Sequence, residues 1–143
     1  MPTTSPTTRA TEPSALYPIR SDEDVIRFRH EARAAALAAG LRLIDQTKLV
    51  TAASELARNA LVHGGGGQAE ILPAASPGRT GVRLIVEDDG PGIGDIVQAL
   101  TDGYTVGGGM GLGLPGTRRL VDVFELWSEL GVGTCVTVEK WAS

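Results

Sequence analysis

Hydrophobic residues recur at helical spacing in two long segments of the first half of the chain. Ser21, a typical N-cap residue, is followed by acidic residues that suit the positive end of a helix dipole. The first helix is therefore predicted to begin at Ser21 and to end at Gly40, because glycine commonly ends helices. A second helix is predicted over about residues 45–62, before the consecutive glycines 64–67. The apolar stripes of the two helices are Val25, Phe28, Ala32, Ala35 and Ala39, and Leu49, Ala53, Leu56 and Ala60.

The remaining apolar residues follow the alternating pattern of β-strands. The predicted strands are 17–20, 68–72, 82–87, 124–128 and 134–141. Glycine and proline predict a turn or hairpin loop over 73–81 and a turn over 131–133. A third main helix is predicted over 114–123, and a short helix over 95–101. The order β-α-α-β-β-loop-α-β-β favours an α/β sandwich, in which helices cover one face of a mixed, mostly antiparallel sheet.

Composition narrows the class of protein. A length of 143 residues suits one domain, and a hydrophobic content of 42% supplies a core. The net charge of −4 argues against nucleic acid as a partner, since that binding depends on basic residues. The lone Cys135 excludes an intramolecular disulfide, and no Cys/His cluster has zinc-ligand spacing.

The start of the chain differs in composition from the rest. Residues 1–15 are rich in Thr and Pro and contain almost no apolar side chains, so they are expected to form a disordered tail before a folded domain at 16–143. The segment does not resemble a signal peptide, and no apolar run approaches the ~20 residues that span a bilayer. A cytoplasmic protein without a membrane partner is therefore expected.

A polar pair lies at the edge of the apolar stripe of the second helix. Glu55 and Asn59 form an E-x-x-x-N motif and lie one helical turn apart on the same face. They are about 100° from the centre of the stripe, a position from which a helix can line a cleft. The alternative is an ordinary exposed helix edge, which is the commoner meaning of such a pair when it occurs alone.

A glycine-rich turn follows the predicted strand 82–87. Asp88 at its start could accept a hydrogen bond from an exocyclic amine, such as that of adenine. Gly90 and Gly92 would allow the backbone to approach a flat ligand closely. Asp-Gly and Pro-Gly are also common in plain turns, so a simple turn is the alternative.

A second glycine-rich segment, residues 107–116, leads into the third predicted helix. Unpaired backbone N–H groups in such a segment can bind phosphate. It is not a Walker A loop, because no Gly-Lys-Ser/Thr follows, and no strand precedes it at the distance that a dinucleotide-binding motif requires. The alternative is a flexible linker, which does not account for the abrupt return of Leu112 and Leu114.

These motifs and the turn at 131–134 occur in an order that resembles the N, G1 and G2 boxes and the final G-x-G-T turn of the GHKL ATPases. The resemblance covers about residues 17–141 and implies the Bergerat-type fold of that superfamily, with ATP as the ligand. Within the superfamily, DGYTVGGGMGLGLPG and LPGTRRLVD resemble segments of the RsbT-type serine/threonine protein kinases. One departure is ALVHGGGG at 60–67, where an aromatic residue and Ala are expected before the glycines.

The resemblance implies a role for each matching residue. Asn59 would coordinate Mg²⁺ at the ATP phosphates, and Glu55 would be the general base that accepts the proton of a Ser or Thr hydroxyl. Asp88 would bind the adenine amine, assisted by Thr134. The other nucleotide-binding residues that it implies are Gly90, Gly92, Gly107, Gly108, Gly109, Met110, Gly111, Leu112, Gly113 and Leu114.

The resemblance also implies protein partners. Kinases of this type phosphorylate STAS-domain antagonist proteins, bind a stressosome-like STAS scaffold and switch to a PP2C-type phosphatase. Two other functions stay open: an anti-sigma factor with kinase activity that binds a sigma factor directly, and a non-catalytic ATP-binding adaptor. The glycine-rich segment argues against the first and Glu55 argues against the second. Whether Arg58 and His63 act in the site is open at this point.

Overall fold

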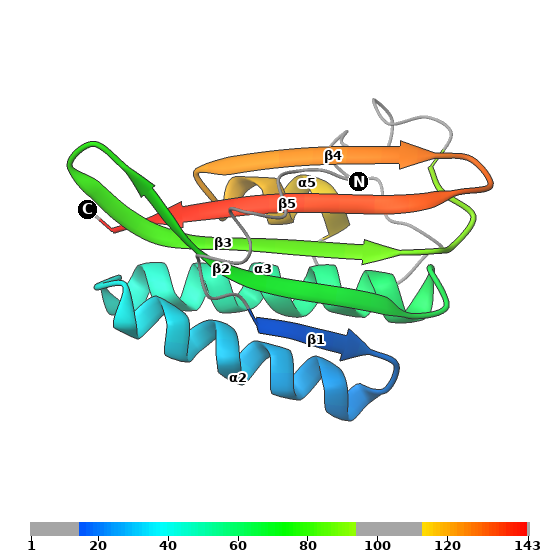
Figure 1. Cartoon of the computed structure of the whole chain (residues 1–143), viewed down its shortest axis with the longest axis horizontal. Coiled ribbons are helices and arrows are strands. Elements are labelled where there is room, and N and C mark those ends of the chain that lie inside the picture. Colours follow the sequence, from blue (N-terminus) through cyan, green and yellow to red (C-terminus); the bar gives the residue numbers. More distant parts are fainter. Residues whose placement is uncertain (1–14, 94–112, 143) are drawn as a thin grey trace.

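A five-stranded antiparallel sheet lies against three helices in the part of the chain that the structure describes, residues 15–93 and 113–142 of a computed structural model (Figure 1). The strands are β1 (Ala15–Ile19), β2 (Gly67–Ser76), β3 (Arg79–Asp88), β4 (Val123–Glu129) and β5 (Gly133–Trp141). The helices are α2 (Asp22–Ala38), α3 (Leu43–Val62) and α5 (Gly113–Arg119). The strand order is β1-β2-β3-β5-β4, and each neighbouring pair is antiparallel. The predicted α/β sandwich is confirmed.

One face of the sheet packs against the helices. Residues directly opposite each other in neighbouring strands share a face, and Leu84 lies opposite both Ile71 and Val138. These three side chains are buried together with Phe28 of α2 and Leu49 of α3. Burial of each large apolar side chain contributes roughly 1.5–3 kcal/mol, so this layer is the main source of stability. None of the helices in the described ranges is long and apolar enough to cross a membrane.

The start of α2 is fixed by the side chains that the sequence indicated. The hydroxyl of the N-cap Ser21 accepts a hydrogen bond from the Asp24 backbone N–H (3.2 Å), and the Asp24 carboxylate accepts one from the Arg20 backbone N–H (2.8 Å). Both bonds satisfy backbone donors that the helix itself leaves without a partner. The helix ends at the C-cap Ala39, directly before the predicted Gly40.

β2 and β3 form a hairpin where a turn or hairpin loop was predicted, but the predicted bounds of 73–81 are wrong. β2 continues to Ser76 and β3 begins at Arg79, so residues 77 and 78 alone form the turn. Gly78 has a φ of +78°, a conformation that glycine adopts readily. Pro73 fits into β2 because it lies beyond Ile71, the last β2 residue that pairs with β1 in the described residues, and proline is tolerated at such edges.

The third helix is shorter than predicted. α5 ends at Arg119, because the chain turns away and joins the sheet as β4. In this turn the Leu120 N–H donates to the Thr117 carbonyl (3.0 Å), and the Asp122 N–H donates to the Glu139 carbonyl of β5 (2.9 Å). The predicted segment 114–123 therefore contains both the helix and its exit.

The other differences concern boundaries. β1 begins at Ala15, which pairs with Ile71, rather than at residue 17. α3 begins at Leu43 rather than at 45, and it ends at the predicted Val62. The predicted short helix at 95–101 and the first fourteen residues of the predicted tail lie outside the described residues.

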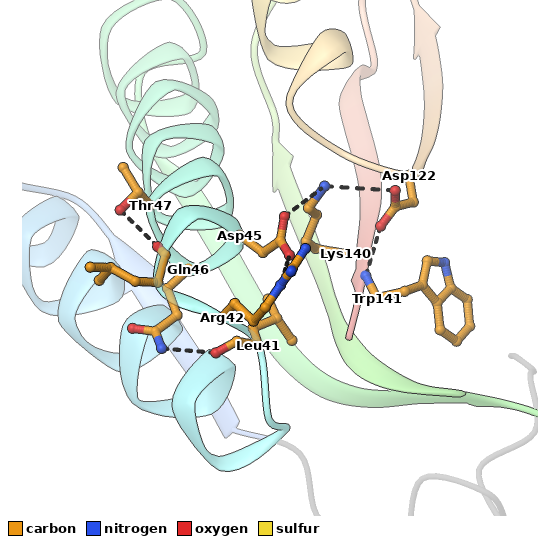
Figure 2. A network of polar contacts seen from close by, with 9 residues as sticks. Leu41, Arg42, Asp45, Gln46, Thr47, Asp122, Lys140 and Trp141 are labelled. Carbon is orange, nitrogen blue, oxygen red and sulfur yellow. Dashed lines mark hydrogen bonds and ion pairs between the residues drawn. The ribbon is translucent and has the colours of Figure 1, made fainter. Parts of the chain in front are cut away.

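A buried lysine joins three elements at the end of the sheet that lies away from Asp88. Lys140 of β5 lies 3.6 Å from the carboxylate of Asp45 in α3 and 3.6 Å from that of Asp122, which precedes β4 (Figure 2). Its side chain is only 10% exposed. Asp122 also accepts a hydrogen bond from the Trp141 backbone N–H (2.8 Å). The two carboxylates compensate the buried ammonium charge and hold α3 against the connection between α5 and β4.

Replacement of Lys140 with Met is expected to lower the free energy of unfolding by about 3 kcal/mol, because it leaves Asp45 buried without its main cation. Chemical denaturation followed by circular dichroism measures the change. The matched control is Arg42→Met. The Arg42 side chain is 73% exposed, and its guanidinium group lies 3.9 Å from the Asp45 carboxylate. A loss of about 0.5 kcal/mol or less is expected for the control. Equal losses in the two variants would contradict the role given to Lys140.

Candidate functional site

A cavity of about 100 Å³ lies between α3, the start of α5 and the adjoining ends of β3 and β5. The turn that follows β3 closes one side of it. Its apolar lining residues are Leu56, Ala60, Val86, Pro91, Ile93, Leu114 and Val136, and its polar lining side chains are Asn59, His63, Asp88 and Thr134. An apolar wall with a few convergent polar groups is typical of a small-molecule site.

Asp88, the last residue of β3, presents a partly buried carboxylate to this cavity. One of its oxygens accepts a hydrogen bond from the Gly90 backbone N–H (2.8 Å). Burial raises the pKa of the Asp88 carboxyl above its ordinary value and Asp89 adds to the rise, whereas backbone hydrogen bonds from Gly90 and Thr134 act in the opposite direction. A carboxylate that has lost part of its water in this way favours a hydrogen bond from a ligand N–H.

The backbone at Gly64 and Gly90 packs closely around the Asp88 side chain. A Cβ atom at Gly64 would collide with the Asp88 carboxyl group, and one at Gly90 would collide with the Gly64 backbone. Glycine alone fits these two positions without displacement of the carboxylate. The segment after β3 is therefore more than a simple turn, because the end of α3 and the Asp-Gly pair together set the position of Asp88.

Ser128 of β4 belongs to the site although no motif indicated it. Its hydroxyl accepts a hydrogen bond from the Ile93 backbone N–H (2.7 Å) and lies 2.8 Å from the Thr134 hydroxyl. A second tie runs from the Gly131 N–H to the Pro91 carbonyl (2.9 Å). The β4–β5 hairpin thus holds the turn after β3 against the cavity. A signal for Ser128 exists only in the hairpin register, which places it opposite Thr134.

The two residues of the E-x-x-x-N motif occupy different positions. Asn59 lines the cavity, whereas Glu55, one turn earlier on α3, is partly buried and is not among the lining residues. The Asn59 backbone carbonyl accepts hydrogen bonds from the N–H groups of His63 (2.9 Å) and Gly64 (3.2 Å), which fixes the end of α3 beside the cavity. His63 also lines the cavity, and Arg58 is exposed.

The two glycine-rich segments are described to different extents. Gly92 lines the cavity, and Gly90 contacts Asp88 without being part of the lining. Gly113 begins α5 and Leu114, which is 4% exposed, forms part of the cavity wall. The predicted residues Gly107, Gly108, Gly109, Met110, Gly111 and Leu112 lie outside the described residues.

The chemistry of the site leaves room for a metal that a ligand brings with it. Within residues 15–93 and 113–142, no group of three or more His, Cys, Asp or Glu side chains is arranged to hold a metal ion. Mg²⁺ bound to phosphates needs no such group, because it usually takes one or two oxygens from the protein and keeps several waters. The amide oxygen of Asn59 is an oxygen of this kind at the cavity, so the residues present fit a phosphate-bound Mg²⁺.

Comparison with known proteins identifies the class to which these features belong. Residues 44–142 match the family described as histidine kinase-, DNA gyrase B- and HSP90-like ATPases. Over 123 residues, 86% of this chain and 92% of the relative, the chain is 42% identical to the serine/threonine-protein kinase RsbT of Bacillus subtilis (strain 168). The chain belongs to the RsbT-type kinases of this ATPase family. The resemblance that the motifs indicated is confirmed.

Membership of the RsbT-type kinases makes the chain an ATP-using serine/threonine protein kinase. A solved structure with a similar fold contains the RsbU and RsbW domains of Rv1364c from Mycobacterium tuberculosis, with a TM-score of 0.62 and 22% identity. The match covers 92% of this chain and 32% of that one. At this identity the likeness concerns the fold alone.

Proposed function

We propose that this chain transfers the γ-phosphoryl group of Mg²⁺-bound ATP to a Ser or Thr of a STAS-domain antagonist protein in the cytoplasm. The observation that carries the proposal is the convergence of Asn59 and Asp88 on one cavity, in a chain that is 42% identical to a serine/threonine-protein kinase. Asn59 supplies an oxygen ligand for the metal, and Asp88 supplies a hydrogen-bond acceptor for the adenine ring. An Mg²⁺–ATP complex needs these polar contacts at its two ends.

Asp88 is proposed to recognise the adenine base. Its carboxylate would accept a hydrogen bond from the exocyclic amine, while the flat ring would lie against the apolar wall that Val86, Ile93 and Val136 form. The Thr134 hydroxyl, held by Ser128, would provide a further polar contact to the base or to a bridging water. The close backbone approach at Gly64 and Gly90 supports this role, because it leaves the carboxylate little freedom to turn away.

Asn59 is proposed to be the protein ligand of the Mg²⁺ that accompanies ATP. The metal would neutralise phosphate charge during transfer, which is a large part of the catalysis in reactions of this type. Residues 107–114 are proposed to contact the phosphates, as the sequence motifs predict. The position of Asn59 on the last turn of a helix whose end is fixed by backbone hydrogen bonds supports this role.

Glu55 is proposed to be the general base. Its carboxylate would accept the proton of the acceptor hydroxyl as the phosphorus–oxygen bond forms and ADP leaves. Glu55 does not line the cavity, so the acceptor segment would approach along the side of α3 on which Glu55 lies, one turn before Asn59. Positioning of the two substrates and charge neutralisation carry most of the remaining rate enhancement.

Replacement of Asp88 with Asn is expected to weaken ATP binding by about ten- to a hundredfold, because hydrogen bonds to charged groups contribute about 1.5–3 kcal/mol. Isothermal titration calorimetry measures the affinity. Asp89→Asn is the matched control, since Asp89 is exposed and is not among the cavity-lining residues. An unchanged ATP affinity in Asp88→Asn would show that Asp88 does not bind the adenine ring.

The raised pKa of Asp88 sets the direction of two pH effects. The carboxylate must be ionised to accept the amine hydrogen bond, so its contribution to ATP affinity is lost as pH falls through that pKa. The sign is opposite for folding: the folded state holds this proton more tightly than the unfolded chain, so the contribution to stability is largest at low pH and is lost as pH rises through the folded pKa. Asp88→Asn is therefore expected to leave the ligand-free protein at least as stable as the wild type at neutral pH.

A transfer assay tests the proposed reaction. The purified chain is incubated with radiolabelled ATP, Mg²⁺ and each STAS-domain protein of the same organism, with EDTA in the control. Label on a Ser or Thr of one STAS protein, located by mass spectrometry and absent with EDTA, is expected. The phosphorylated product is expected to release the kinase, which would then bind a PP2C-type phosphatase in size-exclusion chromatography. Absence of label on every STAS protein, together with tight binding to a sigma factor, would contradict the proposal.

A further inference from the structure

Basic and apolar side chains form a stripe along one side of α2. Ile26, Arg29, His30, Arg33 and Leu37 fall within an arc of about 100° when the helix is viewed along its axis; they are named the α2 stripe here. The apolar residues at its two ends are 47% and 67% exposed, although they are large aliphatic side chains. The three basic residues lie between them. The stripe therefore has an apolar residue at each end and a positive centre.

The centre of the α2 stripe opens into a groove between α2 and α3, the two helices that lie side by side in Figure 1. The groove has a volume of about 380 Å³ and is lined by Arg29, His30 and Arg33, with the buried Val50 of α3 at its base. Within the described part of the chain, the three basic side chains form no hydrogen bond or ion pair.

The groove is separate from the nucleotide site. None of its lining residues is shared with the cavity that Asn59 and Asp88 line. The positive charge is also local, because the whole chain carries a net charge of −4. The basic centre of the α2 stripe is thus a distinct feature of the surface, which the described site does not use.

We infer that the α2 stripe is a docking surface for an acidic, amphipathic helix of a partner protein. The centre of the partner helix is expected to carry carboxylates, because guanidinium groups pair with carboxylates through two parallel hydrogen bonds. Apolar residues of the partner helix are expected to contact the two apolar ends of the stripe. Ile26 and Leu37 are about 16 Å apart along α2, so a helix with two apolar residues about eleven positions apart, and carboxylates between them on the same face, matches the surface. Arginine is enriched at protein interfaces, whereas lysine is depleted there, and the three basic residues of the stripe include two arginines and no lysine.

A binding assay without ATP tests the inference, so its outcome is independent of the phosphoryl-transfer reaction. The probe is a fluorescein-labelled helical peptide with two Leu about eleven positions apart and Glu at the intervening positions of that face. Fluorescence anisotropy measures its affinity. The double variant Arg29→Glu/Arg33→Glu is expected to bind at least about tenfold more weakly, and Ile26→Ser/Leu37→Ser about fivefold more weakly. Added salt is expected to weaken binding to the wild type.

The matched control is Arg27→Glu, because Arg27 is an exposed cation of α2 outside the arc of the stripe. It is expected to bind the peptide within about twofold of the wild type. ATP affinity shows that each variant is folded and is expected to be unchanged in all of them. The inference is overturned if the wild type does not bind the peptide, if it binds a scrambled peptide equally well, or if Arg27→Glu and the double variant lose the same affinity. Stronger binding to transfer RNA or to anionic vesicles than to the peptide would also overturn it.

Discussion

Asn59→Ala is expected to lower Mg²⁺-dependent phosphoryl transfer at least about a hundredfold, because a missing contact to the charge that develops at the phosphates costs about 3 kcal/mol or more. The change removes the amide oxygen at the cavity and leaves the backbone carbonyl that accepts the His63 and Gly64 N–H groups. The end of α3 should therefore keep its structure. The measurement is the initial rate of label transfer from ATP to the acceptor protein, together with ATP affinity at several Mg²⁺ concentrations.

The control for this variant is Arg58→Ala, which changes the neighbouring exposed residue of the same helix. Its rate is expected to stay within about twofold of the wild type if Arg58 is a solvated side chain. The Mg²⁺ dependence separates the metal role from a structural one: Asn59→Ala should weaken ATP binding in the presence of Mg²⁺ and change it little in EDTA. Wild-type transfer by Asn59→Ala would refute the metal assignment.

Glu55→Gln is expected to reduce kcat for phosphoryl transfer about a hundred- to ten-thousandfold and to leave ATP affinity nearly unchanged. Glutamine keeps the size and the polarity of the side chain, but it cannot take up a proton. The measurements are kcat and KM for the acceptor protein at saturating ATP, and the dissociation constant of ATP by calorimetry. A parallel loss of ATP affinity would indicate a structural role for Glu55 instead.

Ser54→Ala is the matched control for the general base. Ser54 and Glu55 are adjacent polar residues on α3 and both are partly buried, but residues at successive helix positions point in different directions. Only the change at Glu55 should show the large effect on kcat. The pH–rate profile adds a second criterion, because loss of the base should remove the acidic limb of the wild-type profile. A Glu55→Gln variant with wild-type kcat would mean that another group, or none, accepts the proton.

The sequence predicted the elements that local chemistry determines. The N-cap Ser21, the end of α3 at Val62 and the strands around Leu84 and Val138 follow from capping, glycine and alternation, which act over a few residues. The extension of β2 and β3 into the predicted turn was missed because Pro73 and its neighbours also suit a turn, and only the sheet edge makes them acceptable in a strand. The early end of α5 was missed for a similar reason: hydrogen bonds to the sheet determine it.

The candidate site was predictable where one motif lies in one segment. Asn59 and Asp88 come from such motifs, and the structure brings them to the same cavity. Ser128 had no such signal, because its role depends on the register between β4 and β5 and on the turn that follows β3. The role of Glu55 and those of residues 107–112 stay predictions. The first depends on where an acceptor protein binds, and the second on residues outside the described part of the chain.

The glycines that follow α3 end the helix in the sequence prediction, and the packing at the cavity shows that two of them are also closely enclosed. Gly64 has the Asp88 carboxyl group beside it, and Gly67 lies against the backbone carbonyl of Glu87, so neither position has space for a side chain. The joint between helix and sheet is tightly confined at these two positions. The rearrangements that admit ATP and discharge ADP are therefore expected to come from other segments, and the proposed adenine-binding end of the cavity is expected to stay in place.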